Sequence, residues 1–331
     1  MLSALVEFAG CAVIIFVAGT VLTRCADAIA DLTGFGRLLV GSILLAGATS
    51  LPELTVDVSA VRLGLPDMAV GDLMGSSLFN LLILAVIDTL HQSRGRLLSR
   101  ASAAHALSAT VSMLLTALAA AGILLGQHHE RTILGIDLTS IAILIAYVLG
   151  VRLVFYDQKA AAEKQDVLMP AGPRTTLMRA LAGFVGAAAA ILVAGPFMAE
   201  AAGTLAELSG LGGTFVGTTL VAFSTSLPEL VASLAAVRMG AFDLAVGNVF
   251  GSNAFNMVLL IPLDVAFQQG SLMAAVSSNH ALTCLASISV TCVAVAGQLY
   301  QVERRVKFVE PDAMLMIILI GGSLLLLYFV R

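Results

Sequence analysis

The sequence predicts an all-α polytopic membrane protein with ten transmembrane helices, arranged as two inverted five-helix repeats. Three observations lead to this prediction: an apolar composition, a series of apolar runs long enough to span a bilayer, and an internal repeat. Hydrophobic residues make up 59% of the 331 residues, and charged residues only 11%. Ordinary soluble domains are about 25% charged, so the composition indicates a chain that crosses a membrane several times.

The apolar runs divide the chain into ten candidate spans. A span needs ~20 mostly apolar residues. Runs of about that length lie at 3–23, 38–61, 67–90, 101–126, 132–155, 177–199, 213–237, 243–267, 278–298 and 311–330. The first run has no Lys or Arg before it, so we expect a retained span and not a cleaved signal peptide.

The basic residues fall mostly on one side of the predicted membrane. With ten spans, 14 of the 17 Lys and Arg residues lie on the side that the chain reaches after its first span. The positive-inside bias makes this side cytoplasmic. Both termini are therefore expected on the outer side.

The internal repeat is long and free of gaps. GSILLAGATSLPELTVDVSAVRLGLPDMAVGDLMGSSLFNLLILAVID (Gly41–Asp88) aligns with GTTLVAFSTSLPELVASLAAVRMGAFDLAVGNVFGSNAFNMVLLIPLD (Gly217–Asp264), 176 residues later, with 23 of 48 positions identical. The two copies begin five predicted spans apart, and an odd number of crossings inverts the second copy. We expect a first repeat half at 1–156, a cytoplasmic linker at 157–176 and a second half at 177–331. Inverted repeats place ion sites near the bilayer midplane.

Each repeat carries an ionisable acid inside an apolar run. The segment TSLPE occurs as Thr49–Glu53 and again as Thr225–Glu229. An acid near the bilayer centre costs at least ~2.5 kcal/mol on insertion scales and is a functional candidate by default. A packed, protonated acid is the alternative for a single Glu, but two Glu residues with identical flanks favour an ion site.

The proline of each motif frees backbone oxygens. Pro52 and Pro228 have no N–H to donate and clash with the carbonyl four residues earlier, so we expect a helix kink at each of them. Carbonyl oxygens near 46–48 and 222–224 then become available to a cation.

A second segment of each repeat adds hydroxyl and amide oxygens. It reads GSSLFN at Gly75–Asn80 and GSNAFN at Gly251–Asn256. Ca²⁺ takes six to eight oxygens from carboxylates, carbonyls, amides and hydroxyls, and the two segments together supply all of these types. The added oxygens are those of Ser76, Asn80, Ser252 and Asn256. A packing role stays open for each hydroxyl, because a lone Ser or Thr in a span often bonds a backbone carbonyl.

The paired TSLPEL and GS…FN segments resemble the two alpha repeats of the cation/calcium antiporter superfamily, and the chain is most similar to its prokaryotic sodium/calcium exchangers. The resemblance implies Ca²⁺ export against an inward flow of Na⁺ by alternating access, in a prokaryotic plasma (inner) membrane. It also implies transported Ca²⁺ and Na⁺ without a cofactor, and no protein partner. Its implied metal ligands are Glu53, Glu229, Thr49, Thr225, Ser50, Ser226, Asn80, Asn256, Ser76, Ser252, Ala46 and Ala222.

Departures from the family pattern bear on the coupling ion. Asn256 stands where potassium-dependent relatives have Asp, and the acid that proton-coupled relatives carry near Asn80 and Asn256 is lacking. The resemblance therefore favours sodium coupling. Coupling to protons, another divalent substrate and a passive cation channel remain as alternatives.

Two acids distinguish the first repeat from the second. Asp57 and Asp72 occupy positions that the second repeat fills with the uncharged Ser233 and Asn248. We interpret them as an outer vestibule that attracts cations, or as an acid that adds proton coupling. An ion pair between Asp57 and Arg62 is an equally open reading.

Other classes of function find little support in the sequence. It contains no Gly-x-Ser-x-Gly, His-Glu-x-x-His or Gly-x-Gly-Asp motif, and no histidine lies near either motif glutamate. We therefore expect no enzymatic activity. The formal charge of −4 gives no reason to expect a nucleic-acid partner.

Overall fold

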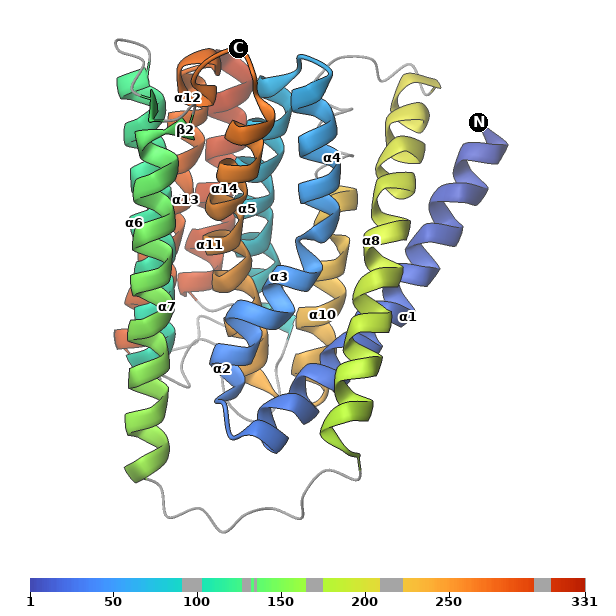
Figure 1. Cartoon of the computed structure of the whole chain (residues 1–331), viewed down its shortest axis with the longest axis vertical. Coiled ribbons are helices and arrows are strands. Elements are labelled where there is room, and N and C mark those ends of the chain that lie inside the picture. The colour runs from blue at the N-terminus through green and yellow to red at the C-terminus, as the bar shows by residue number, and fades with distance from the viewer. Residues whose placement is uncertain are drawn as a thin grey trace. The chain divides into compact units, whose positions relative to one another are not determined.

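The structure is a computed structural model that describes residues 1–90, 103–126, 132–133, 136–164, 175–208, 223–300 and 311–330. Nearly all of these residues are helical (Figure 1). The elements are α1 (Leu2–Thr33), α2 (Arg37–Val40), the π-helix η1 (Gly41–Leu45), α3 (Ala46–Thr49), α4 (Leu51–Arg62), α5 (Pro66–Leu90), α6 (Ala103–Gly126), β1 (Thr132–Ile133), β2 (Ile136–Asp137), α7 (Leu138–Lys164), α8 (Leu177–Leu208), α10 (Leu227–Arg238), α11 (Phe242–Ala266), α12 (Leu272–Ala275), α13 (Asn279–Tyr300) and α14 (Pro311–Val330).

Seven helices of the described chain are long and apolar enough to cross a membrane. An eighth span is formed if the interrupted pair Arg37–Thr49 and Leu51–Arg62 counts as one. The shorter α14 is also apolar, and the predicted span 213–237 lies partly outside the described residues. Several membrane-spanning helices are therefore present, while the number ten stays a prediction.

The first helix is longer than the apolar run that predicts it. α1 continues past Arg24 to Thr33 and ends at Gly34, whose φ of 72° is left-handed and whose N–H bonds the Ala30 carbonyl. Glycine adopts this conformation without a Cβ penalty, which explains the position of the stop. At the other predicted junction, α7 continues to Lys164, so the predicted linker at 157–176 begins as helix.

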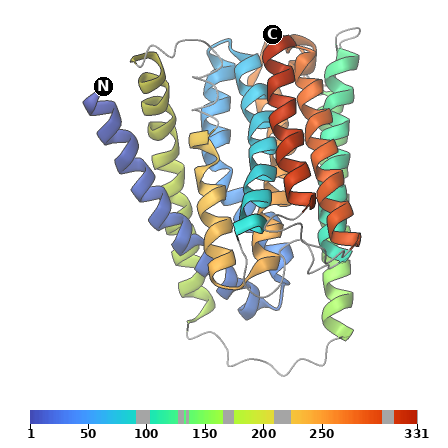
Figure 2. The same ribbon diagram turned by 180° about the vertical axis from the view of Figure 1, so that it is seen from behind.

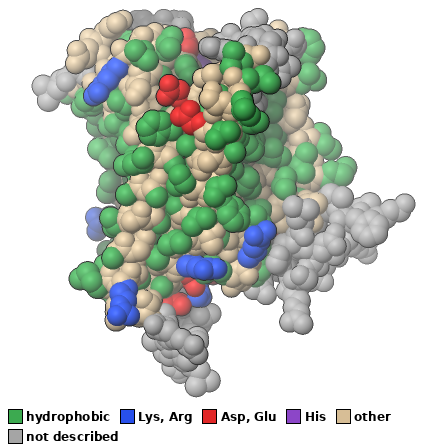
Figure 3. Space-filling view, turned by 90° about the vertical axis from the view of Figure 1, so that its right-hand side faces the viewer, with side chains coloured by type: hydrophobic (Ala, Val, Ile, Leu, Met, Phe, Trp, Pro, Cys, Tyr) green, Lys and Arg blue, Asp and Glu red, His purple; other side chains and the backbone are tan. Residues whose placement is uncertain are grey.

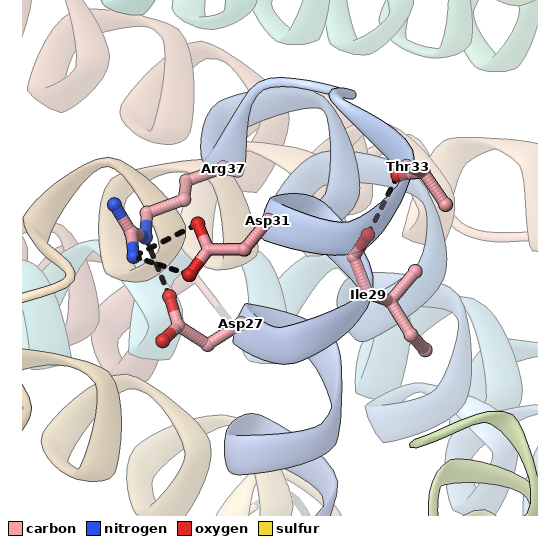
Figure 4. A network of polar contacts seen from close by, with 5 residues as sticks. All are labelled: Asp27, Ile29, Asp31, Thr33 and Arg37. Atoms are coloured by element: carbon pink, nitrogen blue, oxygen red, sulfur yellow. Dashed lines mark hydrogen bonds and ion pairs between the residues drawn. The ribbon is translucent and has the colours of Figure 1, made fainter. Parts of the chain in front are cut away.

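Acidic residues in the last turns of α1 hold the following turn. Arg37 donates to Asp27, and its other nitrogen lies 3.1 Å from an oxygen of Asp31 (Figure 4). These acids end the apolar run in the sequence, but the helix continues through both of them and their charges are paired with Arg37.

The motif helices break instead of bending smoothly. Ser50, between α3 and α4, has φ −86° and ψ 10°, and Ser226, before α10, has φ −83° and ψ 2°. Each serine lies two residues before the motif proline, and in both copies a new helix starts at the following leucine. Pro52 and Pro228 thus occupy the first turn of a helix, where a missing N–H costs little.

The described chain forms two compact units, each built from both halves of the sequence. Unit 1 comprises Met1–Pro52 and Leu149–Ser252, and unit 2 comprises Glu53–Val148 and Asn253–Arg331. Unit 1 therefore holds α1, α2, η1, α3, α8, α10, the end of α7 and the first part of α11. Unit 2 holds nearly all of α4, together with α5, α6, β1, β2, α12, α13, α14, the start of α7 and the rest of α11.

In unit 1, α1 lies along α8 and α10, as both ribbon views show (Figures 1 and 2). Two glycines permit close approach to the motif segments. A Cβ on Gly19 would lie 2.9 Å from Val231, and a Cβ on Gly195 would lie 2.4 Å from Pro52. The two glycines are 176 residues apart, which is also the offset of the repeat.

A second close crossing in unit 1 joins the backbones of two helices. A Cβ on Gly41 would lie 2.6 Å from the Leu244 carbonyl oxygen, and a Cβ on Gly251 would lie 2.4 Å from the Ser42 Cα. Small residues at such crossings let membrane helices pack closely. The crossing fixes η1, and hence α3, against α11.

Unit 2 packs α13 against α5, α6 and α14 around an apolar core. A hairpin of β1 and β2 precedes α7, and Asp264 anchors it: its Oδ2 accepts from the Asp137 N–H at 2.6 Å and from the Ser140 hydroxyl at 3.0 Å. Its Oδ1 accepts from the Leu272 N–H at 3.0 Å. The acid that ends the repeat thus ties three segments together.

Hydrophobic side chains cover much of the outer surface. Figure 3 shows a face on which they predominate and charged side chains are few. Exposed examples are Val185, Val193, Leu285 and Phe329. Such exposure is expected where lipid, and not water, covers a helix.

Candidate functional site

In unit 1, the structure brings the break of the first motif to the acid of the second. The Ser50 hydroxyl donates to Glu229 Oε1 at 3.1 Å. Both side chains are buried, at 0% and 1% exposure. Thr49, also buried, lies one residue before Ser50 and donates to the Ala46 carbonyl at 3.2 Å. Three predicted ligands and a predicted carbonyl therefore meet in one buried group.

Asn248 holds this group in place. Its Nδ2 donates to the Glu229 carbonyl at 3.4 Å and to the Ser233 hydroxyl at 3.0 Å. Its Oδ1 lies 3.4 Å from the Thr49 hydroxyl, as an alternative acceptor to the Ala46 carbonyl. One asparagine on α11 thus connects α10 to α3.

In unit 2, two predicted amide ligands belong to one hydrogen-bonded network. Asn80 Nδ2 donates to Asn253 Oδ1 at 3.0 Å, and Asn253 Nδ2 donates to the Ser77 carbonyl at 3.1 Å. Asn256 Nδ2 donates to the Leu73 carbonyl and to the Ser77 hydroxyl, both at 3.3 Å. The network therefore uses the nitrogen of each predicted amide ligand.

The same network leaves particular oxygens available. The Oδ1 atoms of Asn80 and Asn256 are buried and have no hydrogen-bond partner among the described residues. The Oγ of Ser252, in unit 1, is in the same state. A buried polar atom without a partner costs free energy, and a cation would supply the missing contact. These oxygens fit a hard cation as substrate.

The remaining predicted ligands are buried in one unit or the other. Glu53 and Ser76 lie in unit 2, at 1% and 0% exposure. Thr225 and Ser226 lie in unit 1, each at 0%. Ala222 lies outside the described residues.

Four residues of these networks were missed by the sequence analysis as contributors to a site. They are Ser77, Ser233, Asn248 and Asn253. The repeat offers a signal that points to them: Ser77 and Asn253 occupy equivalent positions inside the GS…FN segments. Polar residues at matched positions beside the predicted ligands indicate supporting contacts.

The two extra acids of the first repeat lie together in unit 2. Asp57 and Asp72 are 1% and 2% exposed, and their carboxyl groups lie close to each other. Arg62 is exposed on the same helix as Asp57, and no ion pair joins these two described residues. The equivalent residues of the second repeat, Ser233 and Asn248, form the neutral hydrogen bond already noted.

The chemistry of the described residues points to oxygen ligands. No group of three or more His, Cys, Asp or Glu that could hold a metal ion occurs in the described ranges. Any cation bound there would instead be held by a carboxylate with hydroxyl, amide and carbonyl oxygens. This mixture suits Ca²⁺ or Na⁺ better than a soft transition metal.

Comparison with known families decides the identity. The family model described as sodium/calcium exchanger protein matches residues 3–157 and 179–330, which is most of the chain. The chain belongs to the sodium/calcium exchanger family. Members of this exchanger family are transporters of Na⁺ and Ca²⁺, so the protein is a membrane antiporter of the cation/calcium type.

Individual relatives of this exchanger agree with the family. It is 28% identical to Inner membrane protein YrbG of Escherichia coli over 260 residues, 77% of each chain. It is 46% identical to Sodium/calcium exchanger MaX1 of Methanosarcina acetivorans over 79 residues, 24% of this chain and 23% of the relative. A solved structure of the sodium-calcium exchanger NCX_Mj matches with a TM-score of 0.71 at 18% identity, over 97% of this chain and 98% of that one. The last comparison establishes the exchanger fold.

Proposed function

We propose that the protein exchanges Ca²⁺ for Na⁺ by alternating access and exports Ca²⁺. The observation that carries this proposal is a set of buried oxygens that have no hydrogen-bond partner in the part of the chain that the structure describes: Asn80 Oδ1, Asn256 Oδ1 and Ser252 Oγ, on the GS…FN segments. Their nearest chemical match is a dehydrated hard cation. The sodium/calcium exchanger family supplies the substrate class.

The proposed calcium site uses predicted ligands from both copies of the repeat. Glu53 and Glu229 would neutralise one Ca²⁺, with oxygens of Thr49, Thr225 and the other predicted ligands completing its shell. The matched positions of the two glutamates in the repeat support the proposal. Ser50 and Ser226 would line adjacent sodium positions.

The inverted repeat is also part of the proposal, with halves at 1–156 and 177–331. Reciprocal contacts in unit 2 support it: α5 Asn80 contacts α11 Asn253, and α11 Asn256 contacts α5 Ser77. An offset of 176 residues converts one pair into the other. A two-fold relation between the copies would generate this exchange of partners.

Sodium is the proposed coupling ion, and the plasma membrane the proposed location. A relative named as a sodium/calcium exchanger supports the first proposal, and a relative named as an inner membrane protein supports the second. The bias of Lys and Arg supports an outer position for both termini. We propose that the first and sixth spans slide past the rest of the protein during alternating access.

Proton coupling is a second candidate because of one contact. The buried carboxyl groups of Asp57 and Asp72 lie close together, and such a pair can take up and release a proton. The remaining family pattern, with Asn at 80 and 256, favours sodium.

Flux measurements in proteoliposomes test the proposed function. We expect vesicles loaded with Na⁺ to accumulate Ca²⁺ when diluted into Na⁺-free medium, and to accumulate none when diluted into equal Na⁺. If three Na⁺ leave for each Ca²⁺ that enters, one positive charge leaves per cycle. An inside-positive potential should then accelerate uptake. Uptake without any sodium gradient would indicate a channel, and uptake driven equally by a pH gradient in the absence of Na⁺ would indicate proton coupling.

A separate prediction concerns the acids of the first repeat, which we propose attract cations on the outer side of the site. Replacing both by their repeat equivalents, Asp57→Ser with Asp72→Asn, should weaken the apparent affinity for external Ca²⁺ and leave the internal affinity almost unchanged. The removed negative charge provides the physical reason. Calcium titrations from each side of oriented vesicles measure the difference. Equal shifts on both sides would contradict the proposal, as would an equal effect of the control Arg62→Gln.

A further inference from the structure

The orientation of the side-chain amide matters for the asparagines of the proposed site, whereas the carboxylates of the glutamates have no such requirement. A carboxylate presents oxygen at both ends, whereas a carboxamide presents one oxygen and one NH₂. An amide flipped by half a turn would direct N–H groups at a cation and repel it. The orientation of Asn80 and Asn256 therefore decides whether either can be a ligand.

One backbone carbonyl of α5 and one hydroxyl bonded to it settle the orientation of Asn256. Its amide lies 3.3 Å from the Leu73 carbonyl oxygen, which can only accept a hydrogen bond, so the atom that faces it must be Nδ2. The Ser77 hydroxyl donates its own proton to this same carbonyl at 2.9 Å. Ser77 Oγ is thus left to accept from Asn256, and both contacts require nitrogen at the same end of the amide.

The orientation of Asn80 is settled indirectly. Asn253 lies 3.1 Å from the Ser77 carbonyl oxygen, an acceptor, so Asn253 must direct Nδ2 there. Its Oδ1 then faces Asn80. Because this oxygen can only accept a hydrogen bond, Asn80 must direct its Nδ2 there, at 3.0 Å. Asn80 Oδ1 is left free of partners among the described residues. The Ser77 carbonyl thus fixes the orientation of the Asn253 amide, and Asn253 in turn fixes the orientation of Asn80.

We propose that Asn253 is a positioning residue that directs Asn80 Oδ1 toward the transported cation without binding the cation itself. This inference rests on the proposed function, because it assumes that Asn80 is a ligand. Asn253 and Ser77 are equivalent in the repeat but act differently. Asn80 Nδ2 has its described bond only through Asn253, whereas Asn256 Nδ2 keeps the Leu73 carbonyl if the Ser77 hydroxyl is lost. Asn253 is therefore the more sensitive of the two positions.

Calcium binding to the purified full-length protein, measured by titration calorimetry, tests the inference. Contacts that orient a metal ligand typically change affinity about 10- to 100-fold when they are removed. We expect Asn253→Ala to weaken Ca²⁺ binding by about 10-fold or more. The matched control Ser77→Ala should have a smaller effect, because Asn256 retains a backbone partner.

A double-mutant cycle separates positioning from damage to the fold. In an Asn80→Asp background, both ends of the side chain at 80 are oxygen, so its orientation no longer matters. We expect Asn253→Ala to cause little further loss of Ca²⁺ affinity in that background. The same loss in both backgrounds, or an unchanged affinity in the single variant, would overturn the inference.

The variant Glu53→Gln, measured in the same assay, tests the proposed function independently of the positioning role. Loss of Ca²⁺ binding in Glu53→Gln with unchanged binding in Asn253→Ala would refute only the positioning role. Unchanged binding in Glu53→Gln would instead refute the proposed site, and with it the premise of the inference.

Discussion

Glu53→Gln and Glu229→Gln are each expected to abolish calcium/sodium exchange. Each replacement removes one of the two negative charges proposed to balance Ca²⁺, and buried sites have little water to compensate. Folding should survive, since Gln has nearly the same shape and Glu229→Gln retains an oxygen to accept from the Ser50 hydroxyl. Sodium-driven Ca²⁺ uptake by proteoliposomes measures activity, and size-exclusion chromatography measures folding.

Glu200→Gln is a suitable control for these variants. Glu200 is an exposed acid on α8, so its replacement should leave exchange almost unchanged. Exchange at the wild-type rate in either Glu53→Gln or Glu229→Gln would contradict the assignment of that residue as a ligand. A loss of exchange accompanied by aggregation would point to a structural role.

The second large effect is expected at a glycine. Gly251→Ala should strongly destabilise the protein, because the new Cβ would lie 2.4 Å from the Ser42 Cα and 2.5 Å from the Ser42 carbonyl oxygen. These are backbone atoms of η1, so a whole helical segment must move. Overpacking of this kind costs about 1–3 kcal/mol and occasionally more. The midpoint of thermal unfolding in detergent should fall accordingly.

The repeat provides a matched control for this glycine as well. Gly75 is the equivalent of Gly251, and a Cβ there would have no heavy atom within 4 Å. Gly75→Ala should leave the unfolding temperature unchanged or raise it, since Ala is favoured over Gly in helices by about 1 kcal/mol. Equal destabilisation of the two variants would show that helix geometry, and not the contact with Ser42, sets the requirement for glycine.

Much of the helical framework could be predicted from hydropathy alone. Spans such as 243–267 and 311–330 differ from α11 and α14 by at most one residue at each end. The end of α1 could not be predicted in this way, because Asp27 and Asp31, which pair with Arg37, interrupt the apolar pattern while the helix continues through them. A hydropathy profile scores each residue separately and takes no account of such an ion pair.

The site illustrates the same limit. The motif indicated which residues carry suitable oxygens, but the direction of an amide depends on partners distant in the sequence. Asn253 and Ser77 were missed for that reason, since their role appears only once α5 and α11 lie side by side. The burial of Asp57 beside Asp72 was likewise not apparent, because the sequence offered Arg62 as an equally near partner.

The Leu73 carbonyl has a consequence for how this protein can change over generations. A carbonyl belongs to the backbone, so replacing the side chain at 73 does not remove it. The polarity of Asn256 is thus specified by an atom that point substitutions at that position leave in place. Drift at residue 73 is limited by packing in the apolar core, where Leu73 is fully buried, and not by the chemistry of ions. If Asn253 has the proposed positioning role, inherited changes of cation affinity should therefore arise at that side chain before they arise at Leu73.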